Sequence, residues 1–235
     1  MTVADRGVEG IIGVAVLLMV TVLAVGGLTS VMGSMVTGGV AHAEVATVSG
    51  TLTMVTAAAD DPTMRTMVVR SGTLSTDTLK LEITGGDITV AEQVAALRYR
   101  TDDHGVSSEF GTQIHTINGE PVRVSGHRIR RADNRLLVGV PSVRLREVDT
   151  VATNGQAVRL GLLPRVDVDH RRLPPARYRL HLETAHPSVW QQILEGVGAE
   201  VHTRAAAGGT ARVSATFDEP VSIEIITETI ELEVA

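Results

Sequence analysis

The sequence predicts an α+β protein that is mainly β. An apolar amino-terminal α-helix, which crosses a membrane or packs against its neighbours in an assembly, precedes an antiparallel β-sheet or sandwich domain with one short helix in its carboxyl-terminal half. Three observations predict this fold class. No Asp, Glu, Lys or Arg occurs from Gly10 to Ala43. Beyond that stretch, β-branched residues recur in short runs separated by turn sequences. Near Trp190, one run of apolar residues has helical spacing.

The first element is a hydrophobic helix expected over residues 8–32. Ile, Val, Leu, Met, Ala and Gly dominate between Ile11 and Val31, and this length suffices to cross the hydrocarbon core of a bilayer. A surface helix of a soluble domain would carry a polar face, which this segment lacks. We therefore expect membrane insertion, with residues 33–44 as a Gly/Ser/Thr linker and residues 45–235 as an extracellular β-rich domain.

Three interpretations of the amino-terminal segment compete. Ala41-His42-Ala43 has the pattern of a secretory signal cleaved after Ala43, but the apolar stretch is long for such a signal. An uncleaved membrane anchor explains the length and the hydrophobicity. It does not explain Arg6-Gly7, nor the charge of Glu9 at the edge of the apolar run.

The stretch Arg6-Gly7-Val8-Glu9-Gly10-Ile11-Ile12-Gly13, followed at once by the apolar run, resembles the class III signal of archaeal type IV pilins and archaellins. This resemblance implies a leader of residues 1–7 that ends in a basic residue, Arg6, and Gly7. It also implies that a prepilin peptidase-like enzyme cuts between Gly7 and Val8, while the hydrophobic helix stays on the mature protein. The order of the later elements is similar to that of a haloarchaeal family of pilin-like proteins with no assigned activity.

Glu9 would be the second residue of the mature chain, whereas bacterial pilins carry their glutamate at the fifth position. A desolvated carboxylate there can pair with the new α-amino group of a neighbouring subunit and fix the register of packed helices. Alternatively, Glu9 lies at headgroup level, where the helix dipole favours its charge. The implied partners are membrane lipid, the processing enzyme, and other pilin subunits or copies of this chain that contact the amino-terminal helix.

Short strands are expected along the rest of the chain, separated by turn sequences such as Gly85-Gly86-Asp87 and Asn118-Gly119. A helix is expected from Pro187, with Trp190 as a packing anchor. A change of phase at Ile225-Ile226 predicts a β-bulge in the last strand. The expected strands are 45–55, 79–83, a piece from 88, 96–100, 107–110, 121–124, 135–140, 143–146, 158–163, 178–183, 201–204, 211–217 and 223–234.

The residues predict neither catalysis nor a cofactor. Asp167-Val168-Asp169-His170 places its imidazole on the opposite side of a strand from its carboxylates, so we expect a solvated surface of ion pairs there, not a metal site. Asp102-Asp103-His104-Gly105 lacks the ligand pattern of a calcium loop and is interpreted as a polar turn. The net charge of −6 and the lack of a basic, aromatic-rich stretch argue against a nucleic-acid partner. The expected protein is not an enzyme and lies in the cell membrane, with its β domain outside and possible incorporation into a surface filament.

Overall fold

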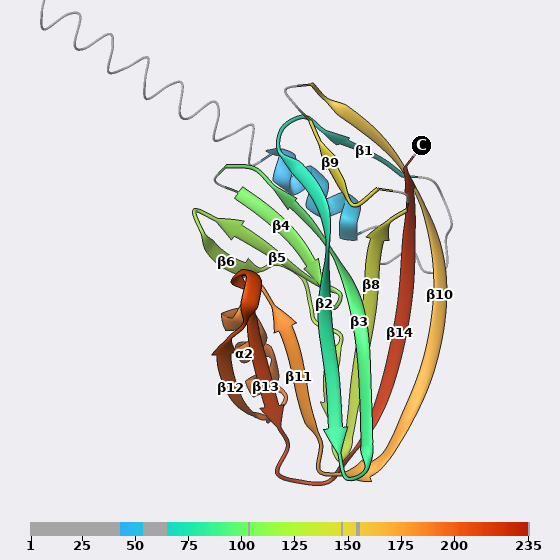
Figure 1. Ribbon diagram of the computed structural model, residues 1–235, viewed down its shortest axis with the longest axis vertical. Helices are drawn as coiled ribbons and strands as arrows, with labels where there is room; N and C mark the ends of the chain where they lie inside the picture. The colour runs from blue at the N-terminus through green and yellow to red at the C-terminus, as the bar shows by residue number, and fades with distance from the viewer. Residues whose placement is uncertain (1–42, 54–64, 103, 147, 154–155, 235) are drawn as a thin grey trace, which may run out of the picture. The chain divides into compact units, whose positions relative to one another are not determined.

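The computed structural model describes residues 43–53, 65–102, 104–146, 148–153 and 156–234. Residues from Glu44 onward form one compact unit, which is mainly β (Figure 1). Its described strands form two sheets. Sheet A runs in the order β1 (Arg65–Val69), β10 (Val158–Ala176), β14 (Val221–Val234), β8 (Arg135–Leu145) and β7 (Ile129–Ala132). Sheet B runs β12 (Glu200–Ala205), β13 (Ala211–Thr216), β11 (Arg179–Thr184), β2 (Thr73–Gly85), β3 (Ile88–Arg100), β4 (His104–Glu109), β5 (Thr112–Ile117) and β6 (Glu120–Arg123), with β9 (Thr150–Ala152) also paired to β2.

The carboxyl-terminal helix, α2 (Pro187–Gly196), packs against β12 and β13. Proline at its first position loses no hydrogen bond, because the first N–H groups of a helix have no partner within the helix. Trp190 is fully buried and meets the ring of Phe110 edge-on, with the centroids 5.2 Å apart. Trp190 is thus part of the core that joins α2 to the sheet.

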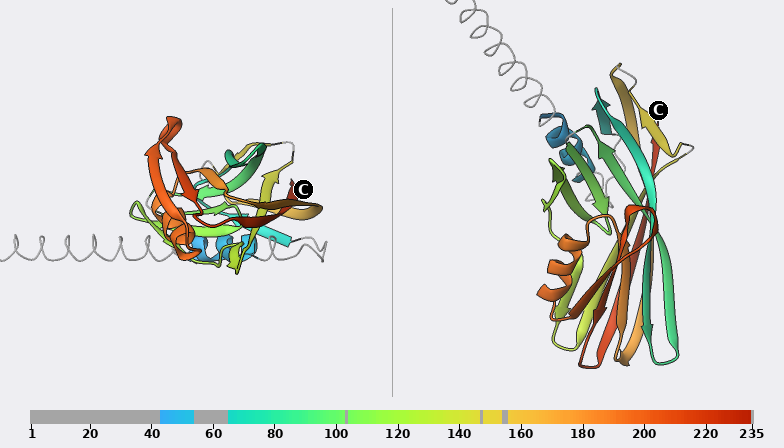
Figure 2. Two further views of the ribbon diagram at one scale, coloured as in Figure 1. Left: turned by 90° about the horizontal axis from the view of Figure 1, so that it is seen from below. Right: turned by 60° about the vertical axis from the view of Figure 1, so that its left-hand side comes forward.

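Two hydrophobic cores lie between these elements. The first core contains α2, the lower halves of β2, β3, β8 and β14 as drawn in Figure 1, and parts of β11 and β13. The second core contains the upper halves of β2, β3, β8 and β14 with parts of β1, β4 and β10, and it is closed by the helix of residues 43–53. Figure 2 shows this helix, in blue, close to β4 and β5. Each long strand therefore contributes to both cores.

The two cores lie on opposite faces of the long strands. In β2, Leu74 belongs to the second core and Leu79 to the first, while the pairing with β3 continues past both without a register shift. Because side chains alternate between faces, an even and an odd residue point to opposite sides. The same change occurs in β14 between Ile225 and Ile230. Pairing is continuous there too, so the predicted β-bulge at Ile225-Ile226 is wrong, and the phase change marks a change of buried face.

Sheets A and B contact each other where β3 meets β8. The backbone N–H of Ala95 donates a hydrogen bond of 2.9 Å to the hydroxyl of Ser142. The side chains at this point are small, so the strands come together without large groups between them. This contact lies between the two cores, where the buried side chains change face.

Glu44 fixes the helix of residues 43–53 to the β domain. Its carboxylate accepts hydrogen bonds from the backbone N–H of Arg70, from the backbone N–H of Ser71 at 3.1 Å and from the hydroxyl of Ser71 at 2.9 Å. Burial opposes ionisation of Glu44, but these bonds lower its pKa below the ordinary value. Burial also raises the pKa of Tyr99 to about 12, so its hydroxyl remains a donor, 2.7 Å from the carbonyl oxygen of Ser71.

The structure corrects the expected fold class. Residues 43–53 are helical where a strand was expected from residue 45, so the described residues hold two α-helices instead of one. Val45, Val48 and Leu52 are buried at helical spacing, and the β-branched content of the segment was misleading. Neither of these helices is long and apolar enough to cross a bilayer. The helix expected over residues 8–32 lies outside the described residues, so the structure gives it no support.

The strand arrangement differs from the expectation as well. β14 pairs with β8 in parallel, so sheet A is not antiparallel throughout. β3 and β8 are each continuous where two pieces were expected, and β10 is much longer than predicted. The sequence analysis did not predict β1, β5, β7 or β9. The strand at β11, the helix α2 and the last three strands lie close to their expected positions.

We predict that Glu44→Gln lowers the free energy of unfolding by about 1–3 kcal/mol, because the neutral amide cannot accept from all three donors of Arg70 and Ser71 and hydrogen bonds to a charged group are the stronger ones. Denaturant unfolding of the full chain in detergent, followed by the fluorescence of Trp190, measures this. Glu120→Gln on exposed β6 is the matched control and should change little. Equal unfolding free energies for both variants would contradict the proposed role of Glu44.

Candidate functional site

A buried carboxylate organises the most polar part of the interior. Glu109, the last residue of β4, is completely buried. Its oxygens accept hydrogen bonds from the hydroxyl of Thr184 at 2.5 Å, from Nδ1 of His186 at 2.8 Å and from Nε1 of Trp190 at 3.1 Å. The guanidinium of Arg98 lies 4.0 Å away and is itself held by Asp77 at 3.0 Å. One carboxylate therefore connects β3, β4, the end of β11 and α2.

Glu109 is ionised in this setting. Burial is the largest influence and by itself would raise the pKa of Glu109, but the hydrogen bond and charge of His186 and the hydrogen bonds from Thr184 and Trp190 lower it below the ordinary value. A carboxylate only accepts hydrogen bonds, so Nδ1 of His186 carries a proton. The other ring nitrogen, Nε2, then faces the hydroxyl of Thr116 at 3.3 Å.

Local structure and contacts with β4 together position His186. It is the N-cap residue of α2, followed by Pro187. Its backbone N–H donates to the hydroxyl of Thr184 at 2.9 Å, and that hydroxyl donates in turn to Glu109. Ser107 and Glu109 lie two residues apart on β4 and so share a face, which brings the Ser107 hydroxyl to 3.4 Å from Nδ1.

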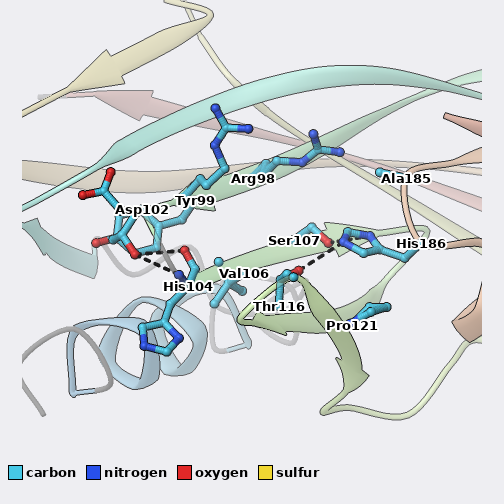
Figure 3. A pocket seen from close by; sticks show the side chains of 14 residues that line it. Arg98, Tyr99, Asp102, His104, Val106, Ser107, Thr116, Pro121, Ala185 and His186 are labelled. Carbon is cyan, nitrogen blue, oxygen red and sulfur yellow. Dashed lines mark hydrogen bonds between the residues drawn. The ribbon is translucent and has the colours of Figure 1, made fainter. Parts of the chain in front are cut away.

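Beside His186 there is an open pocket of about 390 Å³. Figure 3 shows the hydroxyls of Ser107 and Thr116 next to the imidazole ring, with Arg98 extending from β3 toward Ala185. Arg98 and Arg100 are two residues apart and project from the same face of β3. The pocket thus has hydroxyl and imidazole groups on one side and guanidinium groups on another. Such groups suit hydrogen bonding to a small polar ligand.

When the ring of His186 is uncharged, the order Thr116, His186, Glu109 makes Nε2 a proton acceptor that is held by a carboxylate on the far side of the ring, as in hydrolase triads. Two observations favour a structural and binding role. The contact of 3.3 Å between Thr116 and Nε2 is long for a bond donated by a hydroxyl. Glu109 also accepts bonds from Thr184 and Trp190, which tie it to the core.

The part of the chain that the structure describes contains no group of three or more His, Asp or Glu side chains arranged to hold a metal ion. In Asp167-Val168-Asp169-His170, on β10, the imidazole of His170 contacts Glu224 of β14 at 2.6 Å. The neighbouring Arg172 reaches the same glutamate at 3.7 Å. These ion pairs run to another strand and not within the motif.

The predicted site residues Arg6, Gly7, Val8 and Glu9 all lie outside the described residues. The sequence analysis did not single out Glu109 or His186 as site residues, although Asp102 and His104 of the predicted polar turn line the pocket beside them. The only signals were a glutamate at the end of a strand and a histidine before a proline. Neither pattern is specific, because such residues are common on exposed turns.

A model of a family of unknown function, DUF7289, matches residues 6–233 of the chain. No curated protein and no solved structure matches it. The family match extends from the amino-terminal motif through the apolar stretch into the last strand of the β domain.

We predict that Glu109→Gln lowers the free energy of unfolding at neutral pH by about 3 kcal/mol, because one of the two acceptor oxygens becomes an NH2 donor that faces another buried donor, and the charged hydrogen bonds are lost. The folded pKa of Glu109 is lowered, so its contribution is present above the unfolded pKa of about 4.3 and is lost as the pH falls through the folded value. The difference between wild type and variant should therefore shrink in acid.

Denaturant unfolding at a series of pH values measures both effects, with Glu120→Gln, on exposed β6, as the control for loss of one carboxylate. A Glu109→Gln variant as stable as the wild type at neutral pH would show that this carboxylate does not hold the elements together.

Proposed function

Because the chain belongs to the DUF7289 family, whose function is unknown, we propose from its own residues that it is a pilin-like structural protein of the cell surface. Its apolar segment, residues 8–32, retains it at the membrane, and its β domain is displayed outside the cell. The observation that carries this proposal is the pair Arg6-Gly7, placed shortly before a stretch without charged residues from Gly10 to Ala43. Assembly into a filament like a type IV pilus is the further step of the proposal.

The family match covers the apolar segment together with the β domain. The match begins at residue 6 and runs without interruption to residue 233. It thus starts beside the proposed cleavage point, between Gly7 and Val8, and includes both the apolar segment and the β domain.

The helix of residues 43–53 is firmly attached to the β domain. Val48 and Leu52 are completely buried in the second core, and Glu44 is bonded to Ser71. Force applied through the preceding chain would therefore act on a packed helix and not on a loose tail.

The proposed partners follow from this arrangement. A prepilin peptidase-like enzyme removes residues 1–7, membrane lipid surrounds the apolar segment, and copies of this chain or other pilin subunits pack against it in an assembly. Glu9 then pairs with the new α-amino group of Val8 in a neighbouring subunit. A second candidate function is a membrane-anchored binding protein that does not assemble, and it is favoured by the polar pocket beside His186.

We predict that the mature protein begins at Val8, which mass spectrometry of the amino-terminal peptide measures directly. Gly7→Val should abolish processing, because the bulky side chain occupies the position before the cut bond, and should leave the protein in the membrane fraction. Gly10→Ala, beyond the cut, is the control. A mature protein that begins at Glu44, or normal processing of Gly7→Val, would overturn the cleavage assignment.

We also predict that Glu9→Gln weakens the contact between subunits about tenfold, which corresponds to loss of about 1.4 kcal/mol, because the ion pair with the α-amino group is removed. Glu9→Asp keeps the charge and should retain more assembly. Counting surface filaments by electron microscopy, at equal amounts of membrane protein, measures the effect. Unchanged filament number in Glu9→Gln would favour plain anchoring.

A further inference from the structure

We propose that one face of sheet A binds an anionic polysaccharide through its carboxylate or sulfate groups. We call this surface the arginine face. It is formed by Arg130 on β7, Arg135 on β8, Arg172 on β10, and Arg128, the residue before β7. It covers the outer side of the half of sheet A whose inner side packs on the first core. This inference rests on the proposed function in one respect: the β domain must lie outside the cell for the polymer to reach it. Binding itself can be measured on the isolated protein.

Strand pairing places the arginines on one side of the sheet. Arg172 lies beside Glu224, Glu224 beside Leu137, and Leu137 beside Arg130, which forms one row across β10, β14, β8 and β7. The chain neighbours of these residues, among them Leu136 and Ile223, are buried in the first core. Because side chains alternate, the row itself faces outward.

Two of these arginines have no charge partner in the part of the chain that the structure describes. Glu224 is engaged by His170 at 2.6 Å and by Arg172 at 3.7 Å, and Glu228 is engaged by Arg128 at 2.6 Å. Within the described residues, no carboxylate pairs with Arg130 or Arg135. Both are exposed, and both line a hollow of about 350 Å³ together with Arg172. The hollow therefore has an excess of cations in a chain whose net charge is −6.

A second hollow of about 260 Å³ adjoins the first and shares Arg130 and Leu137 with it. It is also lined by His127 and Glu228, and among the described residues Nδ1 of His127 and Oε2 of Glu228 have no hydrogen-bond partner. Burial is the largest cause that lowers the pKa of His127, a backbone hydrogen bond with Ile129 opposes it, and the charges of Arg123 and Arg130 lower it further. The second hollow thus contains polar atoms without hydrogen-bond partners among the described residues. Hydroxyl groups of a sugar can form hydrogen bonds with these atoms.

The combination identifies the class of ligand. Guanidinium groups bind carboxylate and sulfate oxygens in a bidentate manner, and two adjoining hollows suit a ligand with repeating units. Between the arginines, Leu137 and Ile226 are half-buried and provide an apolar floor for sugar rings. Single-stranded nucleic acid fits less well, because bases stack on aromatic side chains. The five aromatic residues of the chain, Tyr99, Phe110, Tyr178, Trp190 and Phe217, are all buried.

The test uses the full chain in detergent and fluorescently labelled hyaluronan oligosaccharides as the carboxylated probe, with binding followed by anisotropy. Neutral dextran oligosaccharides and oligo(dT) of similar length are the comparison ligands. We expect binding to hyaluronan that weakens as salt is raised from about 50 to about 200 mM, no binding to dextran, and weaker binding to oligo(dT).

The double variant Arg130→Ala/Arg135→Ala should bind hyaluronan roughly tenfold more weakly, with a shallower salt dependence, because two ionic contacts are lost. The matched control is Arg159→Ala/Arg204→Ala, which removes the same charge from exposed positions on β10 and β12 away from the arginine face. Thermal unfolding checks that both variants are folded.

Equal affinity of the two double variants, or no binding of hyaluronan by the wild type, would overturn the proposal. Binding of oligo(dT) as tight as that of hyaluronan would identify an unspecific polyanion surface and would overturn the assignment to a polysaccharide. Each of these outcomes is independent of whether the mature chain begins at Val8, so a failure here is distinguishable from failure of the proposed surface function.

Discussion

The buried charge of Glu109 is the constraint on which the arrangement of sheet B and α2 depends. An ionised carboxylate without solvent requires several donors, and here they come from segments far apart in the chain: Thr184, His186 and Trp190 follow Glu109 by about seventy-five to eighty-one residues. Removing any one element would leave either the charge or its donors unmet. The network therefore fixes where α2 begins and how Trp190 enters the first core.

The change of buried face along the long strands explains how a chain with so few aromatic residues builds a large interior. Each of β2, β3, β8 and β14 contributes side chains to one core on one face and to the second core on the other. Small groups such as Ser142 allow the sheets to approach between the cores. In the half of sheet A that packs on the first core, the outer side forms the arginine face. The packing of the interior therefore also determines which charges lie together on the surface.

The proposed function is divided between two parts of the chain. In that proposal the amino-terminal motif around Arg6 and Gly7 directs delivery and retention, an interpretation that rests on sequence. The β domain offers two candidate surfaces for contacts with other molecules, the pocket beside His186 and the arginine face. A filament subunit and a binding protein place different demands on these parts, yet both need the helix of residues 43–53 to connect the apolar segment to the fold.

The sequence by itself determined the features that depend on neighbours in the chain. These are the absence of charge from Gly10 to Ala43, the helix that begins at Pro187, and the strands with clear alternation, such as that around Leu81. Tertiary structure alone decided the helix of residues 43–53, whose Val45 and Leu52 are stabilised by burial in the second core and not by helix propensity. It also decided the parallel pairing of β14 with β8, and the meeting of Glu109 with His186. The reason is physical: local patterns record backbone preference and amphipathicity, whereas pairing partners and the burial of a charge depend on contacts between residues distant in sequence, which no local pattern contains.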